Sequence, residues 1–188
     1  MKRVLGTALL CCLPLGAAMG QDNTGPLVGE SKAIVKQFMG SLKGELESAM
    51  KSGGPINAID VCNRVAPAIA EQQSADSGWD VARTSLKLRN PDNAPDDWEK
   101  GVLEKFEAQK AAGEPVKPMA YYETVEEDGQ KVFRFMKAIP TGEVCLKCHG
   151  SDLSPEVAAK LDELYPADEA QGFRIGDIRG AFTLKKPL

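Results

Sequence analysis

The chain has 188 residues, of which 43% are hydrophobic and 27% are charged. This length and balance predict one folded domain around one core. Its 23 lysines and arginines stand against 27 aspartates and glutamates, a formal net charge of −4. The negative charge argues against nucleic acid and anionic membranes as partners, and is compatible with a basic protein partner.

The first 20 residues have the three parts of a secretory signal peptide. Lys2 and Arg3 precede an apolar run, and small residues stand just before Gln21. The apolar run is too short to span a bilayer comfortably, and no later segment is long and apolar enough to do so. We therefore expect residues 1–20 to be cleaved and the mature protein to be periplasmic or secreted, a retained anchor being the alternative.

Helical spacing dominates the first part of the mature chain. Residues 21–29 are predicted to be a flexible leader, and the single domain is expected over residues 30–188. Apolar residues recur at helical spacing over Glu30–Lys51 and again over Pro55–Gln73, with a glycine pair between the two helices. Pro67 lies inside the second pattern, so it should kink that helix and free the carbonyl of Asn63, close to Cys62.

Strand patterns dominate the rest of the chain. Strand-like alternation over 81–88 leads into a turn-rich loop over 90–95, and a third helix is predicted over 96–112. Residues 119–124 and 131–139 are predicted to form a hairpin, 154–157 to start a short helix, and 173–184 to form one or two strands. Helices first and strands late favour an α+β fold, an antiparallel sheet covered by helices.

The run Cys145-Leu146-Lys147-Cys148-His149 is the strongest chemical signal, and His149 is the only histidine in the chain. Cys-x-x-Cys-His is the attachment motif of c-type haem, which the two thiols hold covalently while the imidazole binds the iron. A zinc half-site, a dithiol redox pair or a disulfide are the alternatives, but zinc lacks further good ligands apart from Cys62. Haem attachment of this kind requires export, so it agrees with the predicted signal peptide. We expect this run to lie in a loop after Pro140.

The second axial ligand of such a haem iron cannot be a histidine. Signal cleavage would leave Cys62 as the odd cysteine of an exported chain, which calls for an explanation. It lies within the apolar stripe of its helix, so it is a buried small side chain or a ligand, and a disulfide between two chains is a further alternative. The mature chain also offers four methionines, the usual alternative in electron carriers, as well as lysines and the terminal amine. The methionines are Met39, Met50, Met119 and Met136.

Three stretches resemble a family of c-type haem-binding domains that was formerly a domain of unknown function. They are residues 58–67 around Cys62, residues 83–95 with Arg89-Asn90-Pro91, and residues 143–150 with the haem motif. That family occurs as small soluble cytochromes and as sensor regions of membrane histidine kinases. The resemblance implies a PAS-like fold over about residues 30–185, with Cys62 as the distal haem ligand and His149 as the proximal one. Unlike the kinase-linked members, this chain has no kinase domain.

An exported monohaem c-type cytochrome with Cys/His ligation is therefore expected. A thiolate favours ferric iron and can leave on reduction, so the chain is predicted to sense redox state or a small gaseous ligand. A simple electron carrier with a redox partner protein is the alternative. A haem enzyme is less favoured, because the sequence shows no group of residues suited to distal acid–base chemistry.

The haem propionates need charged hydrogen-bond donors. Arg83 is the preferred candidate, since it precedes a Thr-Ser pair and the stiff loop, and a solvated surface arginine is the alternative. The other candidates are Arg64, Lys87 and Arg89, and aromatic pocket walls are expected from Tyr121, Tyr122, Phe133 and Phe135.

Overall fold

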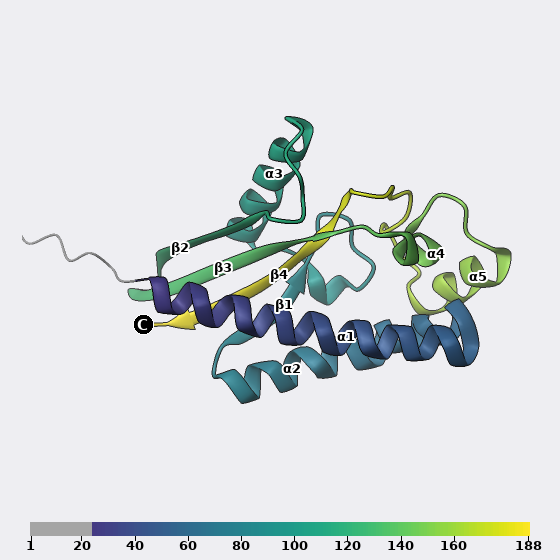
Figure 1. Cartoon of the computed structure of the whole chain (residues 1–188), viewed down its shortest axis with the longest axis horizontal. Helices are drawn as coiled ribbons and strands as arrows, with labels where there is room; N and C mark the ends of the chain where they lie inside the picture. The colour runs from purple at the N-terminus through teal and green to yellow at the C-terminus, as the bar shows by residue number, and fades with distance from the viewer. Residues whose placement is uncertain (1–23) are drawn as a thin grey trace, which may run out of the picture.

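The computed structural model describes residues 24–188, so the predicted signal peptide lies outside the described residues. It is an α+β structure, as predicted (Figure 1). The helices are α1 (Gly25–Asp60), a π-helical turn (Val61–Val65), α2 (Ala66–Ser77), α3 (Asp97–Ala111), α4 (Leu146–His149) and α5 (Pro155–Leu164), with short 3₁₀ turns at Pro91–Asn93 and Glu143–Cys145. The strands are β1 (Asp80–Thr84), β2 (Ala120–Glu127), β3 (Gln130–Pro140) and β4 (Ile178–Pro187).

The four strands form one antiparallel sheet in the order β1-β4-β3-β2. The predicted hairpin is confirmed, and Glu127 pairs with Gln130 across the two-residue turn Asp128-Gly129. Both turn residues have positive φ, 52° and 78°, as a tight hairpin with the right-handed twist requires. The last strand begins at Ile178, so only the second part of the predicted 173–184 segment is a strand.

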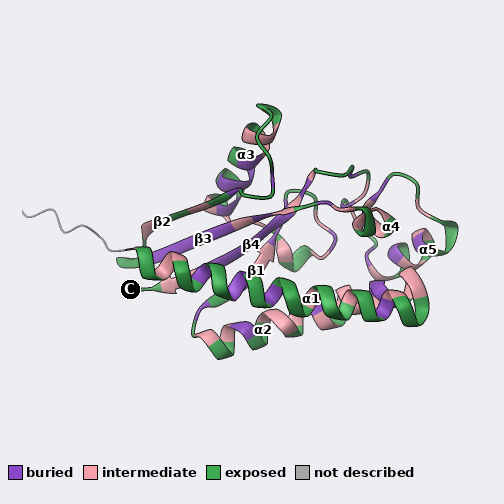
Figure 2. Ribbon diagram, viewed as in Figure 1, coloured by how far each residue is buried: buried purple, intermediate pink, exposed green. Residues whose placement is uncertain are grey.

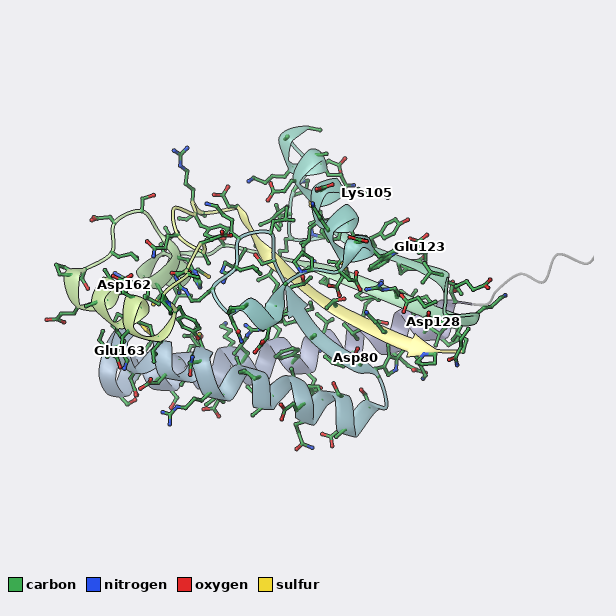
Figure 3. All side chains as sticks on the ribbon, turned by 180° about the vertical axis from the view of Figure 1, so that it is seen from behind. Asp80, Lys105, Glu123, Asp128, Asp162 and Glu163 are labelled. Atoms are coloured by element: carbon green, nitrogen blue, oxygen red, sulfur yellow. The ribbon has the colours of Figure 1, made fainter. Side chains whose placement is uncertain are left out.

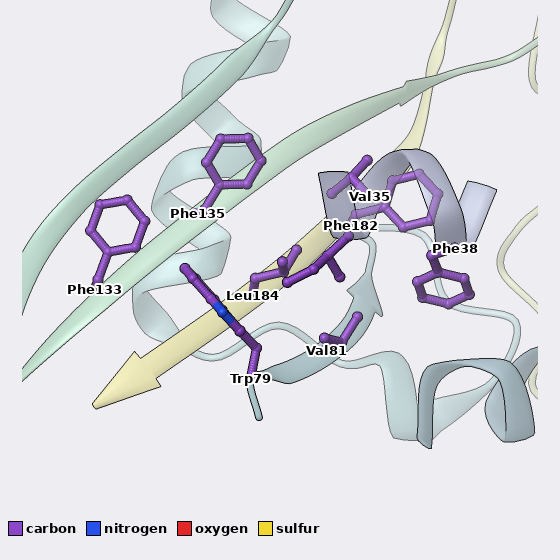
Figure 4. Close-up of a cluster of buried hydrophobic side chains, with 9 residues drawn as sticks. Val35, Phe38, Trp79, Val81, Phe133, Phe135, Phe182 and Leu184 are labelled. Atoms are coloured by element: carbon purple, nitrogen blue, oxygen red, sulfur yellow. The ribbon is translucent and has the colours of Figure 1, made fainter. Parts of the chain in front are cut away.

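Each face of the sheet carries its own hydrophobic cluster. On one face, Phe133 and Phe135 pack with Phe38 of α1 and with Trp79 (Figure 4). On the other face, Met136 and Ala138 pack against the apolar side of α3. Alternate residues of β3 thus point to opposite sides. Because both faces are covered, β3 is buried over most of its length (Figure 2).

The first predicted helix boundary needs a correction. Helix α1 already begins at Gly25, inside the predicted 21–29 leader, because Pro26 suits a first helical turn and Leu27 and Val28 pack against the core. The predicted break between the first two helices is present as a kink. Gly54 has φ 66° and ψ −159°, although the helical hydrogen-bond pattern continues across it to Asp60.

The C-terminal end of α1 packs against α4 and α5, which lie beyond the ends of strands β3 and β4 in Figure 1. Here a third cluster joins Ile59 to Val157, Leu161 and Tyr165, and Cys148 packs against it. Ser154 accepts a hydrogen bond from the backbone N–H of Val157, so α5 is capped as predicted. None of the described helices is long and apolar enough to cross a membrane.

Candidate haem-motif site

The Cys-x-x-Cys-His run is helical rather than a loop, which corrects the prediction. Residues 143–145 form a 3₁₀ turn that continues into α4. A helix of this length places Cys145, Cys148 and His149 on one side, because they are three and four residues apart. The backbone N–H of Gly150 donates to the carbonyl of Leu146 at 3.1 Å, and a Cβ at Gly150 would lie 2.7 Å from that oxygen. Only glycine therefore allows this close end to α4.

Hydrogen bonds from both sides fix the tautomer of the His149 ring. Nδ1 lies 2.7 Å from the carbonyl oxygen of Ala170, which can only accept. Nε2 lies 3.3 Å from Nε of Arg179 and 3.5 Å from Nη1 of Arg89, which can only donate. Both neighbours therefore require a proton on Nδ1 and a lone pair on Nε2, the form in which imidazole binds a metal.

The imidazole is also held neutral. Burial lowers the pKa of His149 well below its ordinary value, and the positive charges of Arg179 and Arg89 lower it further. The hydrogen bond to Ala170 opposes this only in part. At neutral pH, His149 thus keeps an unprotonated Nε2.

Cys62 lies in the π-helical turn between α1 and α2, not beside a simple kink. The backbone N–H of Ala66 donates to the carbonyl of Val61, five residues back. Pro67 gives the reason: it has no N–H, and in an α-helix its ring would clash with the carbonyl four residues earlier, that of Asn63. The extra residue in the turn relieves this clash, so the predicted disruption is present as a π turn around Cys62.

The thiols of the site lie close enough to influence one another. Burial raises the pKa of Cys62, and the charges of Arg83, Arg89 and Arg179 lower it in part. Cys145 also acts on the pKa of Cys62, and Cys62 acts on that of Cys148, which burial raises to about 11. All three cysteines have free thiols. Residues more than 80 positions apart in the sequence therefore meet at one end of the fold.

The arginines around Cys62 are partly those expected. Arg83 lies over the ring of Phe38 at 5.9 Å, and its charge acts on Cys62, so it belongs to the site. Arg64 is 76% exposed and pairs with Asp60, which places it outside. Lys87 is exposed and donates to the carbonyl of Gln171 at 3.0 Å.

Arg179 is a site residue that sequence reasoning did not find. Its Nη1 donates to Ser85 Oγ at 3.2 Å, and its guanidinium lies 5.4 Å from the ring centre of Phe173, which meets His149 edge to face. No motif marks this arginine. Its position depends on the pairing of β4 with β1. Alternation in a single sequence predicts strands, but it does not say which strands pair.

The methionines are not gathered around the site. Met119 and Met136 are buried in the cluster beneath α3, on the other face of the sheet, and Met39 is 51% exposed. Met50 is half-buried on α1. The expected aromatic walls also belong to the sheet: Phe133 and Phe135 lie in the core, Tyr121 packs near Trp98, and Tyr122 is 46% exposed. Phe173 is the aromatic ring beside His149 instead.

Comparisons with known proteins identify the family of the chain. The chain belongs to the Tll0287-like family, whose model matches residues 21–187. A solved structure, that of the cyanobacterial heme-protein Tll0287, is similar over 89% of this chain and 96% of that chain, with 25% sequence identity and a TM-score of 0.59. No curated protein matches the chain.

Proposed function

We propose that the chain is an exported c-type cytochrome with one haem, a PAS-like domain that senses redox state or a small ligand. Cys145 and Cys148 would hold the haem covalently, and His149 and Cys62 would be its axial ligands. The similarity to a protein described as a heme-protein supports haem binding, and the arrangement of this chain's own residues supports the finer assignment. The bound haem would supply an iron that changes between ferric and ferrous states.

The single observation that carries this proposal is the tautomer of His149. A carbonyl on Nδ1 and guanidinium donors on Nε2 leave the metal-binding nitrogen neutral and unprotonated. The three cysteines and this imidazole form a donor set that fits haem c, with two thiols for attachment, one nitrogen ligand and one further sulfur.

Cys62 suits the role of a second, anionic ligand because cations surround it. A thiol must lose its proton to bind iron as thiolate, and burial alone opposes that loss. Arg83, Arg89 and Arg179 act in the opposite direction on the pKa of Cys62. No carboxylate in residues 24–188 forms an ion pair with Arg83 or Arg179. These two cations can therefore compensate an anionic sulfur or the carboxylates of haem.

The test begins with the full-length precursor expressed together with a c-type haem maturation system. Haem that stays with the chain in a denaturing gel, and is lost in Cys145→Ser/Cys148→Ser, would support covalent attachment. A wild-type chain that remains colourless would refute the proposed function.

Ligation by Cys62 is tested by low-temperature electron paramagnetic resonance of the ferric protein. We expect a low-spin signal with the narrow anisotropy of thiolate ligation, lost in Cys62→Ala and kept in the matched control Val61→Ala on the same turn. An identical spectrum in Cys62→Ala would return Cys62 to the role of a buried side chain.

Sensing and simple electron transfer differ in the reduced state. Release of Cys62 on reduction would allow carbon monoxide to bind the reduced protein, as a sensor requires. A reduced protein that binds no carbon monoxide would favour the electron carrier instead.

A further inference from the structure

Ala170, whose carbonyl accepts the hydrogen bond from Nδ1 of His149, is itself held by a buried ion pair. Arg89 and Asp168 meet in a two-point contact, with Nε to Oδ1 at 3.1 Å and Nη2 to Oδ2 at 2.9 Å. Their side chains are only 7% and 2% exposed. An ion pair so deeply buried is rarely a net source of stability, because both charges have lost their water. Its position beside the histidine suggests another role.

Three further hydrogen bonds of this pair lead to the backbone around His149, and Arg89 Nη1 also lies 3.5 Å from Nε2 of His149. Nη2 of Arg89 donates to the carbonyl of Cys148 at 2.6 Å and to that of Ala170 at 3.2 Å. Oδ1 of Asp168 accepts from the N–H of Ala170 at 2.9 Å. One guanidinium therefore links the end of α4 to the carbonyl that accepts from Nδ1. Lysine could not replace it, because a single ammonium cannot make this planar, two-point contact.

The backbone of residues 168–173 runs alongside the histidine and is fixed at several other points. Phe173 N–H donates to the carbonyl of His149 at 2.9 Å, and Gly172 N–H donates to that of Gly150 at 3.1 Å. Glu169 N–H donates to the carbonyl of Leu88, next to Arg89, at 2.7 Å. Residues 168–173 are thus attached to the end of α4 and to the backbone beside Arg89. The Arg89 side chain contacts both of these regions.

We propose that Arg89 and Asp168 are positioning residues that set the orientation and the Nδ1–H tautomer of His149 through the carbonyl of Ala170. Partners of this kind usually change metal affinity or activity 10–100-fold when they are removed, although they do not touch the metal. The proposal rests on the proposed haem ligation for its redox consequence. Its effect on the tautomer of His149 is expected in the haem-free chain as well.

The test compares Arg89→Lys and Asp168→Asn with two controls on exposed residues, Arg174→Lys and Asp162→Asn; Asp162 lies on α5 and is labelled in Figure 3. Nitrogen-15 NMR of the imidazole in the full-length, haem-free chain reports the tautomer. We expect the wild type and the controls to keep the proton on Nδ1. Both test variants should populate the other tautomer, and their Nδ1 proton should exchange with solvent faster than that of the wild type and the controls.

The haem-bound protein supplies a second measurement. A weaker hydrogen bond from Nδ1 makes the imidazole a poorer electron donor, so both test variants should have a higher reduction potential than the wild type and the controls. Asp168→Asn also leaves the Arg89 charge uncompensated, which acts in the same direction. Variants that only melt at a lower temperature, with tautomer and potential unchanged, would overturn the proposal.

A third variant keeps the test decisive if the ion pair proves necessary for folding. Gln171→Leu removes only the amide that donates to Asp168 Oδ2 at 3.0 Å, at a half-buried position. It should shift the potential in the same direction by a smaller amount and speed proton exchange on Nδ1, and no change in either would contradict the proposal.

A chain that takes up no haem would refute the proposed function but leave the tautomer measurement valid, so the two failures are distinguishable.

Discussion

The buried Arg134 and a cluster of three buried or half-buried arginines at the haem-motif site differ in their charge balance. On the α3 side of the sheet, Arg134 is 3% exposed and contacts three carboxylates: Asp96 at 2.6 Å, Glu127 at 2.9 Å and Glu99 at 3.4 Å. Its guanidinium also lies 4.2 Å from the ring centre of Trp98. At the haem-motif site, Arg83, Arg89 and Arg179 come together, and among the described residues Asp168 alone forms an ion pair with any of them.

The difference indicates what each group is for. A buried cation that is fully matched by carboxylates serves the fold, joining α3 to the sheet. Cations in excess of carboxylates cost stability unless something anionic joins them. This cost is visible at Arg179, whose pKa falls to about 10 because of burial and the charges of Arg89 and Arg83. The excess is consistent with a site that receives a thiolate or the carboxylates of haem.

The largest effect on stability is expected when the contacts between Arg134 and its three carboxylates are removed. Arg134→Met leaves three carboxylates without their shared cation and should lower the free energy of unfolding by about 3–5 kcal/mol, the usual loss when one partner of a buried ion pair is removed. Urea unfolding of the haem-free chain measures it, with exposed Arg174→Met as the control. A loss no larger than that of the control would mean that this group does not hold α3.

A smaller effect is expected from acid. Burial by itself raises the pKa of Asp96, but the hydrogen bonds from Glu99 N–H, Arg134 and Lys185 outweigh it and lower the pKa to about 2, from an ordinary 3.8. A lowered carboxyl pKa contributes stability that is complete above the unfolded value and is lost as pH falls through the folded value. Stability should therefore decline between about pH 4 and pH 2.

The matching variant is Asp96→Asn, which cannot titrate. Its free energy of unfolding should be lower than that of the wild type at pH 5, and its decline between pH 4 and pH 2 should be shallower. Parallel pH curves for the two proteins would show that Asp96 is not the group responsible.

The smallest effect on stability is expected at the three arginines of the haem-motif site, which have fewer carboxylate partners. Arg179→Met removes a cation that burial already disfavours, so the free energy of unfolding of the haem-free chain should change by less than about 1 kcal/mol or rise. Urea unfolding beside Arg134→Met makes the comparison direct. Losses of equal size in the two variants would remove the distinction between a structural group and a site that awaits an anion.

Local pattern was sufficient for much of this protein. The amphipathic stripe of α1, the cap of α5 and the tight hairpin were predicted because each depends on residues within a few positions of one another. The Cys-x-x-Cys-His motif was found in the same way, since its chemistry lies within five consecutive residues. Local patterns also misled: the haem motif is helical rather than a loop, and α1 begins within the predicted leader.

Tertiary structure alone decided how the site is assembled. The β1–β4 pairing brings Arg179 to Ser85. The glycine at position 180 permits this close pairing, because a Cβ there would clash with the carbonyl oxygen of Thr84. Arg89 reaches Asp168 and Ala170 across about 80 residues of sequence. Contacts between distant segments depend on packing and charge compensation in three dimensions, and no short pattern records them. The sequence by itself thus supplied the candidate haem ligands, while the fold decided which side chains lie around them.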